Sequence, residues 1–248
     1  MPGSTGRSEA GKATEVEIRP SATVIIVRDP GDSPSILMGQ RSRSAVFMPS
    51  KFVFPGGAVD PSDRLVSLAW HGCDPSLDKL GLEAGDLEPG AIVLAGIREV
   101  WEETGLMLAV REVETKRQGF SVNRHHPSGG PIPACWSEFF GQGVVPSAAG
   151  MKFIFRAITP PGRPRRFDAR FLMVDASQVL NDLDDFSHGS GELSHLSWVP
   201  LHETASLELP FITEVVLAEL EEILSKGDTG RGIPFFHHQD VRSCVSHL

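Results

Sequence analysis

The stretch EPGAIVLAGIREVWEETGL, residues 88–106, contains the pattern that decides the fold. A helix with 100° between residues would place apolar side chains on one face and acidic side chains on the other. The acidic face carries three glutamates within an arc of about 100°: Glu99, Glu102 and Glu103. The small residues Ala95 and Gly96, one turn earlier, are predicted to leave room for a ligand beside the carboxylates. Gly105 suits a left-handed helix cap.

Three carboxylates on one helical face repel one another, so a positive charge is expected close to them. Arg98 can reach Glu102 at the i,i+4 spacing, but one guanidinium group cannot neutralise three carboxylates. Oxygen ligands without histidine or cysteine are typical of Mg²⁺ or Mn²⁺, and Mg²⁺ commonly takes further ligands from a substrate phosphate. The alternative is a charged helix face that only contacts solvent.

The segment FVFPGGAVDPSD, residues 52–63, adds to this pattern. Together with REVWEETGL, residues 98–106, it resembles the signature of the Nudix hydrolases. That signature is a glycine, five residues, a glutamate, seven residues, and then Arg-Glu, an aliphatic residue, any residue, Glu-Glu, any residue, glycine and an aliphatic residue. Gly57 matches its first position, and residues 98–106 match its whole second half.

The first half of this box departs from the signature at two points. Asp63 stands where the family has glutamate, and residues 64–97 make the gap 27 residues longer than the pattern. Such a split box is similar to that of the branch that includes peroxisomal coenzyme A diphosphatases and their bacterial relatives.

The resemblance implies an α+β fold of the Nudix type. We expect an α/β/α sandwich with a central mixed sheet, in which the glutamate helix covers one face and a helix at residues 209–226 covers the other. The domain should extend over residues 21–226, with an insertion at about 64–88. Residues 1–20 are predicted to be a flexible leader and residues 227–248 a C-terminal tail that packs back through apolar side chains.

The same resemblance assigns roles to the box residues. The carbonyl oxygen of Gly57 and the carboxylates of the three glutamates would bind Mg²⁺ or Mn²⁺, and Arg98 would orient a carboxylate. The catalytic base that takes a proton from water would be one of these glutamates or Glu192, the first residue of a predicted strand at 192–199. An acid at the edge of that strand with no catalytic role is an equal alternative for Glu192.

Three arginines are candidates for binding the substrate. Arg166 and Arg170 belong to RFDARF, residues 166–171, which resembles a segment of the same branch and whose charged side chains share one face of a predicted strand. In a pocket either could hold phosphate by forked hydrogen bonds, whereas on an open sheet that face would be solvated. Arg41, at the end of a predicted strand at 35–41, is the third candidate.

The predicted activity is metal-dependent hydrolysis of a diphosphate bond in a nucleoside diphosphate derivative. The split box favours coenzyme A or acyl-CoA as substrate, and ADP-ribose, NADH and nucleotide sugars are alternatives because the box binds only the shared diphosphate. A different class of function is an inactive Nudix module that binds a nucleotide metabolite as a sensor. Retention of all three box glutamates favours the enzyme.

Composition limits the partners and the compartment. The net charge of −9 and the pI near 5.5 argue against general binding to nucleic acid or to an anionic membrane, so a small diphosphate molecule is the expected partner. The three cysteines are too few and too widely spaced for a disulfide framework or a zinc site.

Without a secretory signal the cytoplasm is expected, or the peroxisome in a eukaryote, where the final Ser-His-Leu resembles a peroxisomal address. The oligomeric state cannot be read from the pattern, and a homodimer is one alternative.

Overall fold

The computed structural model of the chain describes residues 16–43, 45, 48–117, 131–227, 230–239 and 242–248. Most of the predicted leader, residues 1–15, lies outside these ranges. Nine strands of the described part form one sheet: β1 (Ile18–Arg28), β2 (Ser35–Arg41), β3 (Phe52–Val53), β4 (Gly56–Ala58), β7 (Lys152–Ile158), β8 (Arg166–Asp175), β9 (Leu193–Pro200), β10 (Pro234–Gln239) and β11 (Arg242–His247).

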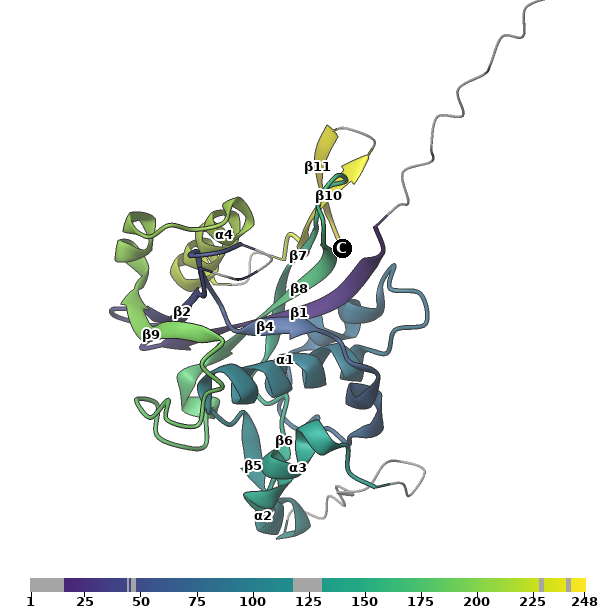
Figure 1. Cartoon of the computed structure of the whole chain (residues 1–248), viewed down its shortest axis with the longest axis vertical. Coiled ribbons are helices and arrows are strands. Elements are labelled where there is room, and N and C mark those ends of the chain that lie inside the picture. The colour runs from purple at the N-terminus through teal and green to yellow at the C-terminus, as the bar shows by residue number, and fades with distance from the viewer. Residues whose placement is uncertain (1–15, 44, 46–47, 118–130, 228–229, 240–241) are drawn as a thin grey trace, which may run out of the picture.

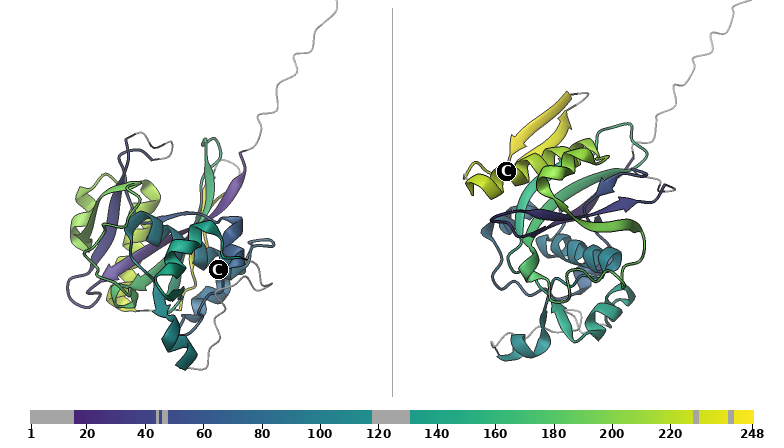
Figure 2. Two further views of the ribbon diagram at one scale, coloured as in Figure 1. Left: turned by 60° about the horizontal axis from the view of Figure 1, so that its bottom comes forward. Right: turned by 90° about the vertical axis from the view of Figure 1, so that its left-hand side faces the viewer.

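The sheet is mixed and lies between helices (Figure 1). Its strand order is β11-β10-β7-β8-β1-β2-β3, while β4 pairs with β1 and β9 pairs with β2. The helix α1 (Pro89–Thr104) covers one face and α4 (Phe211–Lys226) covers the other, as the side view in Figure 2 shows. The predicted α/β/α sandwich with a central mixed sheet is therefore confirmed.

The central strand β1 contributes side chains to a hydrophobic core on each face. Ala22, Val24 and Ile26 lie in the core on the α1 side, and Ile25 and Val27 lie in the core on the α4 side. Side chains alternate along a strand, so an almost unbroken apolar run indicates burial on both faces. The parallel pairing of β1 with β8 and its antiparallel pairing with β2 and β4 make the sheet mixed.

The glutamate helix begins and ends close to the predicted limits. Gly105 has φ 76° and its N–H donates to the carbonyl of Trp101, which confirms the left-handed cap. The prediction for Ala95 and Gly96 was wrong, because both are packed into the core. A Cβ on Gly96 would lie 2.9 Å from Val24 Cγ2, so this glycine lets α1 approach β1 closely.

The insertion packs on the domain through two short 3-10 helices, η1 (Pro61–Leu65) and η2 (Pro75–Gly81). Asp60 and Asp74 cap their N-termini by accepting hydrogen bonds from backbone N–H groups. Leu77 and Leu80 of η2 are buried in the same core as the apolar face of α1. The insertion is therefore part of the core.

Other segments differ from prediction in where strands lie. β1 starts at Ile18, inside the predicted leader, because its first residues pair with β8. The Gly-Gly segment forms β4, and β5 (Ala109–Arg111) pairs with β6 (Val144–Pro146) outside the main sheet. Helices α2 (Glu112–Arg117) and α3 (Ala134–Gly141) flank that small sheet. No helix in the described ranges is long and apolar enough to cross a membrane.

The predicted tail contains the hairpin of β10 and β11, and β10 adds in parallel to the edge strand β7. Ile233 and Phe235 are buried, and Phe236 packs on the α4 side of the sheet. The expectation that apolar side chains pack this segment back on the domain is met. Its extension of the sheet was not predicted.

Replacing Gly96 with alanine should destabilise the protein although alanine favours helices by about 1 kcal/mol. The added methyl group would crowd Val24, and overpacking in a core costs roughly 1–3 kcal/mol. The free energy of unfolding in urea measures this loss. Gly90→Ala is the matched control on the same helix, because its methyl group would meet only Trp70, at 3.5 Å. Equal stability of the two variants would contradict close packing as the reason for Gly96.

Candidate active site

The C-terminal half of α1 presents the three glutamates toward β4. We call Glu99, Glu102 and Glu103 the carboxylate cluster. Glu103 is buried and accepts a hydrogen bond from the backbone N–H of Gly56 at 2.9 Å. A Cβ on Gly57 would overlap the carboxyl group of Glu99, so the absence of a side chain at Gly57 lets this carboxyl group lie against the backbone. The Gly-Gly strand and the helix therefore meet directly at the carboxylates.

Arg98 lies at the centre of a buried ion network. Its Nη1 donates to Glu99 at 2.7 Å and to Glu102 at 3.0 Å, so the contact expected at the i,i+4 spacing is present. Its Nε and Nη2 donate to the two oxygens of Asp63 at 2.9 and 3.1 Å, and Nη2 also donates to the carbonyl of Ala58. One guanidinium group thus holds two glutamates of the cluster.

Asp63 shows that the long gap in the box does not separate its halves in space. Its side chain is fully buried and accepts hydrogen bonds from Trp136 Nε1 at 3.2 Å and from the N–H of Asp60 at 2.9 Å. The sequence identified Asp63 only as a departure from the signature and gave Trp136 no role. A lone tryptophan on an apolar helix offers no signal for this contact, because its partner is 73 residues away.

Arg41 and Glu192 form an ion pair of 3.0 Å across the neighbouring strands β2 and β9. Both charges act on the carboxylate cluster: Glu192 raises the pKa of Glu103 and Arg41 lowers it. Glu192 and Arg41 therefore lie close enough to the carboxylate cluster for their charges to affect Glu103. The Nε of Arg41 is buried with no hydrogen-bond partner within the described part of the chain.

The cluster holds negative charge in a poorly solvated place. Burial raises the pKa of Glu103 to about 8, although the Gly56 N–H favours the ionised form. Burial also raises the pKa of Glu99, against the opposing effect of Arg98. Because burial disfavours the ionised form of both carboxyl groups, a divalent cation beside them would favour ionisation and lower both pKa values.

The donor set fits Mg²⁺ or Mn²⁺ in its chemistry, because it consists of carboxylate oxygens beside the half-buried backbone of Gly57. Within the described residues, however, no three His, Cys, Asp or Glu side chains are already arranged around one point. The reason is visible in the contacts, since Glu99 and Glu102 point to Arg98 and Glu103 points to Gly56. Binding a metal would require rotation of these side chains toward a common centre.

Arg166 and Arg170 lie elsewhere, although both were predicted to bind substrate phosphate. Arg166 Nε donates to the carbonyl of Thr159. Arg170 is fully buried, and it contacts the carbonyl of Leu80 and both the backbone and the carboxylate of Asp168. Each arginine lines a pocket whose walls include no residue of the carboxylate cluster. The alternative of a solvated strand face was wrong, because both side chains are buried. Phosphate binding by either arginine stays a prediction.

Comparison with known proteins agrees with this geometry. No protein-family model matches the chain. A curated Caenorhabditis elegans protein that bears the name nudix hydrolase 7 is 26% identical over 168 residues, which are 66% of this chain and 46% of the relative. The chain therefore spans about half the length of the curated relative it matches, and this similarity supports the Nudix hydrolase family.

A solved structure gives the fold directly. The NUDIX hydrolase from Alicyclobacillus acidocaldarius superposes with a TM-score of 0.56 at 24% identity, covering 85% of this chain and 97% of the other. The chain therefore has the Nudix fold.

Asp63→Asn should lower the free energy of unfolding by roughly 2–4 kcal/mol, because it removes one charge from a buried ion pair. Glu99 and Glu102 would still bind Arg98, which keeps the loss from being larger. Urea denaturation measures the change, with the exposed Asp78→Asn as the matched control. If both variants lose the same small amount, the pair of Asp63 and Arg98 does not stabilise the site.

In metal-free buffer, stability should fall as the pH rises between 4.5, the ordinary pKa of Glu103, and about 8, its pKa in the fold. Over this window the folded state binds more protons than the unfolded state, so the slope is negative and reaches at most about 1.4 kcal/mol per pH unit. Thermal unfolding at several pH values in EDTA measures it.

Glu103→Gln keeps an acceptor for the Gly56 N–H and should flatten this decline, whereas the exposed Glu138→Gln in α3 should not. A wild-type protein whose stability is independent of pH over this window would contradict the raised pKa.

Proposed function

We propose that this chain is a metal-dependent Nudix hydrolase that cleaves the diphosphate bond of a nucleoside diphosphate derivative. The observation that carries the proposal is the partly buried carboxylate cluster on a helix of the Nudix fold. Arg98 holds two of its carboxylates, and two contact the Gly-Gly strand. The similarity to a curated Nudix hydrolase supports the reaction class. The fold alone would not, because one fold hosts many activities.

The metal site of this proposal consists of the three carboxylates and the carbonyl oxygen of Gly57. A bound Mg²⁺ or Mn²⁺ supplies positive charge to the diphosphate and makes a bound water more acidic. Arg98 positions Glu99 and Glu102 through its two hydrogen bonds, and Asp63 fixes Arg98 from the buried side. Glu103, the most buried of the three, contributes a charge that little else in the site compensates.

The two residues of the ion pair, Arg41 and Glu192, have different roles in this proposal. In our proposal Arg41 binds a phosphate oxygen of the substrate, because its guanidinium group is partly exposed beside the cluster. Glu192 is then released from the pair and is the best candidate outside the box for the base that accepts a proton from water. Its side chain is 58% exposed, so it can move without disturbing the core.

Coenzyme A or an acyl-CoA is the proposed substrate, and it rests on the resemblance of the split box alone. ADP-ribose, NADH and nucleotide sugars share the diphosphate that the cluster would bind, so they are the competing substrates. The partner needed is a small molecule, and the expected compartment is the cytoplasm. The second candidate function is a nucleotide-metabolite sensor, and one observation favours it: the carboxylates of the described chain are not already gathered around a metal position.

Incubation with Mg²⁺ or Mn²⁺ and each of these substrates, followed by mass spectrometry of the products, tests the proposal. We expect two phosphate monoesters from one substrate, with turnover that EDTA abolishes. Glu103→Gln should lower the turnover about a hundredfold or more, because it removes a metal ligand and keeps the hydrogen bond to Gly56. Glu138→Gln, with the same change of charge in α3, should be as active as the wild type.

The outcomes separate the alternatives. Release of 3′,5′-ADP from a coenzyme A substrate supports both the reaction and the branch, whereas turnover of another diphosphate keeps the reaction and replaces the substrate. Tight binding of a nucleotide metabolite without any metal-dependent turnover would favour the sensor.

A further inference from the structure

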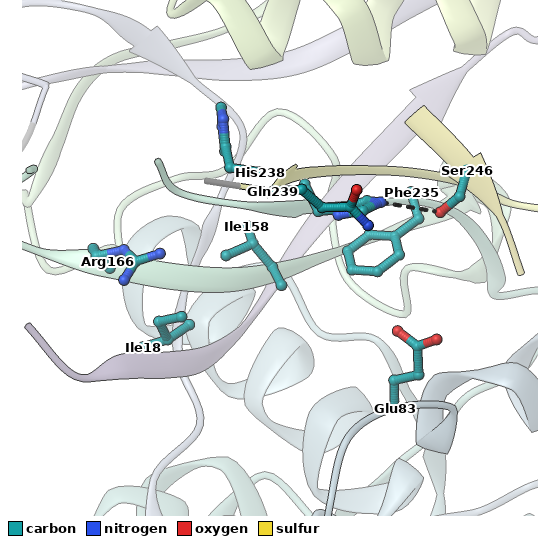
Figure 3. Close-up of a pocket in the computed structure, with 9 residues that line it drawn as sticks. Ile18, Glu83, Ile158, Arg166, Phe235, His238, Gln239 and Ser246 are labelled. Atoms are coloured by element: carbon teal, nitrogen blue, oxygen red, sulfur yellow. Dashed lines mark hydrogen bonds between the residues drawn. The ribbon is translucent and has the colours of Figure 1, made fainter. Parts of the chain in front are cut away.

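Two adjoining pockets lie along the α1-side face of the sheet, near the start of β1 and away from the carboxylate cluster. One has a volume of about 400 Å³ and the other about 520 Å³, and they share Ile18, Glu83 and Ile158 in their walls. Figure 3 shows the larger pocket, with Arg166 and Ile158 on neighbouring strands and Glu83 across from them. We call the smaller one the arginine pocket, because Arg64, Arg156 and Arg170 line it.

Two of these arginines form the buried wall of the arginine pocket. Arg156 and Arg170 lie opposite each other on β7 and β8, with exposed fractions of 2% and 0%. Arg156 is fully engaged: it binds both oxygens of Asp168 at 2.8 Å, the carbonyls of Leu82 and Glu83, and the ring of Phe235 at 4.3 Å. Its position is therefore fixed.

Arg170 contacts the same carboxylate of Asp168 and keeps one hydrogen-bond donor without a partner among the described residues. Its Nη1 contacts Asp168 Oδ2 at 3.1 Å, and its Nε donates to the carbonyl of Leu80 at 3.2 Å. Its Nη2 is buried and has no hydrogen-bond partner among the described residues. Two buried guanidinium groups thus share one carboxylate, which leaves one positive charge and one nitrogen uncompensated.

An uncompensated buried charge and an unpaired donor both cost stability. Burial lowers the pKa of Arg170, with Asp168 acting in the opposite direction and Arg156 in the same direction. An oxyanion in the pocket would supply the missing charge and the missing acceptor together. The exposed Arg64 at the rim adds to the attraction, whereas the exposed Glu83 and Asp86 reduce it.

We propose that the arginine pocket binds the phosphate group of a small molecule, with Arg170 as its main donor. The adjoining pocket gives room for the rest of that molecule. The phosphate could belong to the substrate of the proposed hydrolysis, at a distance from the bond that is cleaved, or to a separate effector. The two sources share the chemistry that the pocket recognises.

Titration with inorganic phosphate, in EDTA and at low ionic strength, tests the pocket by calorimetry on the full chain. Phosphate should bind the wild type, and Arg170→Met should weaken binding by at least about tenfold, because it removes a charge-assisted donor. Circular dichroism must show that this variant is folded. No binding to the wild type, or equal binding to a folded Arg170→Met, would overturn the proposal.

A variant that binds phosphate more tightly than the wild type must be folded, so it tests the pocket without a separate test of folding. Glu83→Gln removes a rim carboxylate and should tighten phosphate binding by about twofold to fivefold at low salt. The matched control Glu138→Gln changes the net charge equally, but lies outside the pocket and should not alter binding. Likewise Arg64→Ala should weaken binding, and Arg111→Ala on β5 should not. Equal effects in a variant and its control would mean that the net charge, not the pocket, attracts phosphate.

Steady-state kinetics then distinguish the two sources. Phosphate that competes with the substrate, with loss of this competition in Arg64→Ala, assigns the pocket to the substrate. Phosphate that changes kcat without competing assigns it to an effector. The calorimetric arm requires no turnover, so the pocket can be established or overturned even if the proposed hydrolysis fails.

Discussion

The buried guanidinium group of Arg98 is the constraint on which the site depends. Burial opposes its charge, but the bonds to Asp63 and Glu99 outweigh that cost and raise the pKa of Arg98 above its ordinary value. Its partners come from α1 and from η1, and it also contacts the backbone just after Gly57. One side chain therefore connects the glutamate helix α1, the Gly-Gly strand β4 and the segment just before the insertion. The three elements must be in place together for the carboxylates to be held.

This connection explains how the two halves of the box meet in space despite the long insertion between them. Asp63 ends the short segment that follows β4, and its hydrogen bond from Asp60 fixes it as the N-terminal turn of η1 forms. The chain can then leave the site, bury Leu77 and Leu80 under the sheet, and return to α1 without moving Asp63. Trp136 closes the network from α3, so a helix beyond the box also supports the site.

The sequence predicted best those features that depend on local periodicity. The apolar face of α1 and its glycine cap follow from the spacing of residues along one element. It predicted least well what depends on distant partners. The unpartnered nitrogen of Arg170 and the pairing of β10 with β7 involve residues far apart in the chain, and no single-element pattern encodes them. Gly96 shows the same limit. A glycine at this position fits both a space for a ligand and close packing of α1 on β1, and the sequence does not distinguish the two.

The charge distribution shows how an acidic chain could accept an anionic ligand. The net charge of −9 repels anions at long range, so binding must come from local groups that are desolvated and therefore weakly screened. The structure contains two such places on one face of the sheet. At the carboxylate cluster the unbalanced charge is negative and requires a cation before a phosphate can approach. At Arg156 and Arg170 it is positive and can meet an oxyanion directly. A molecule with two separated phosphate groups would find complementary charge at both places only when a metal is bound. In that case a bound metal would be needed both for the proposed hydrolysis and for binding a molecule through both of its phosphate groups.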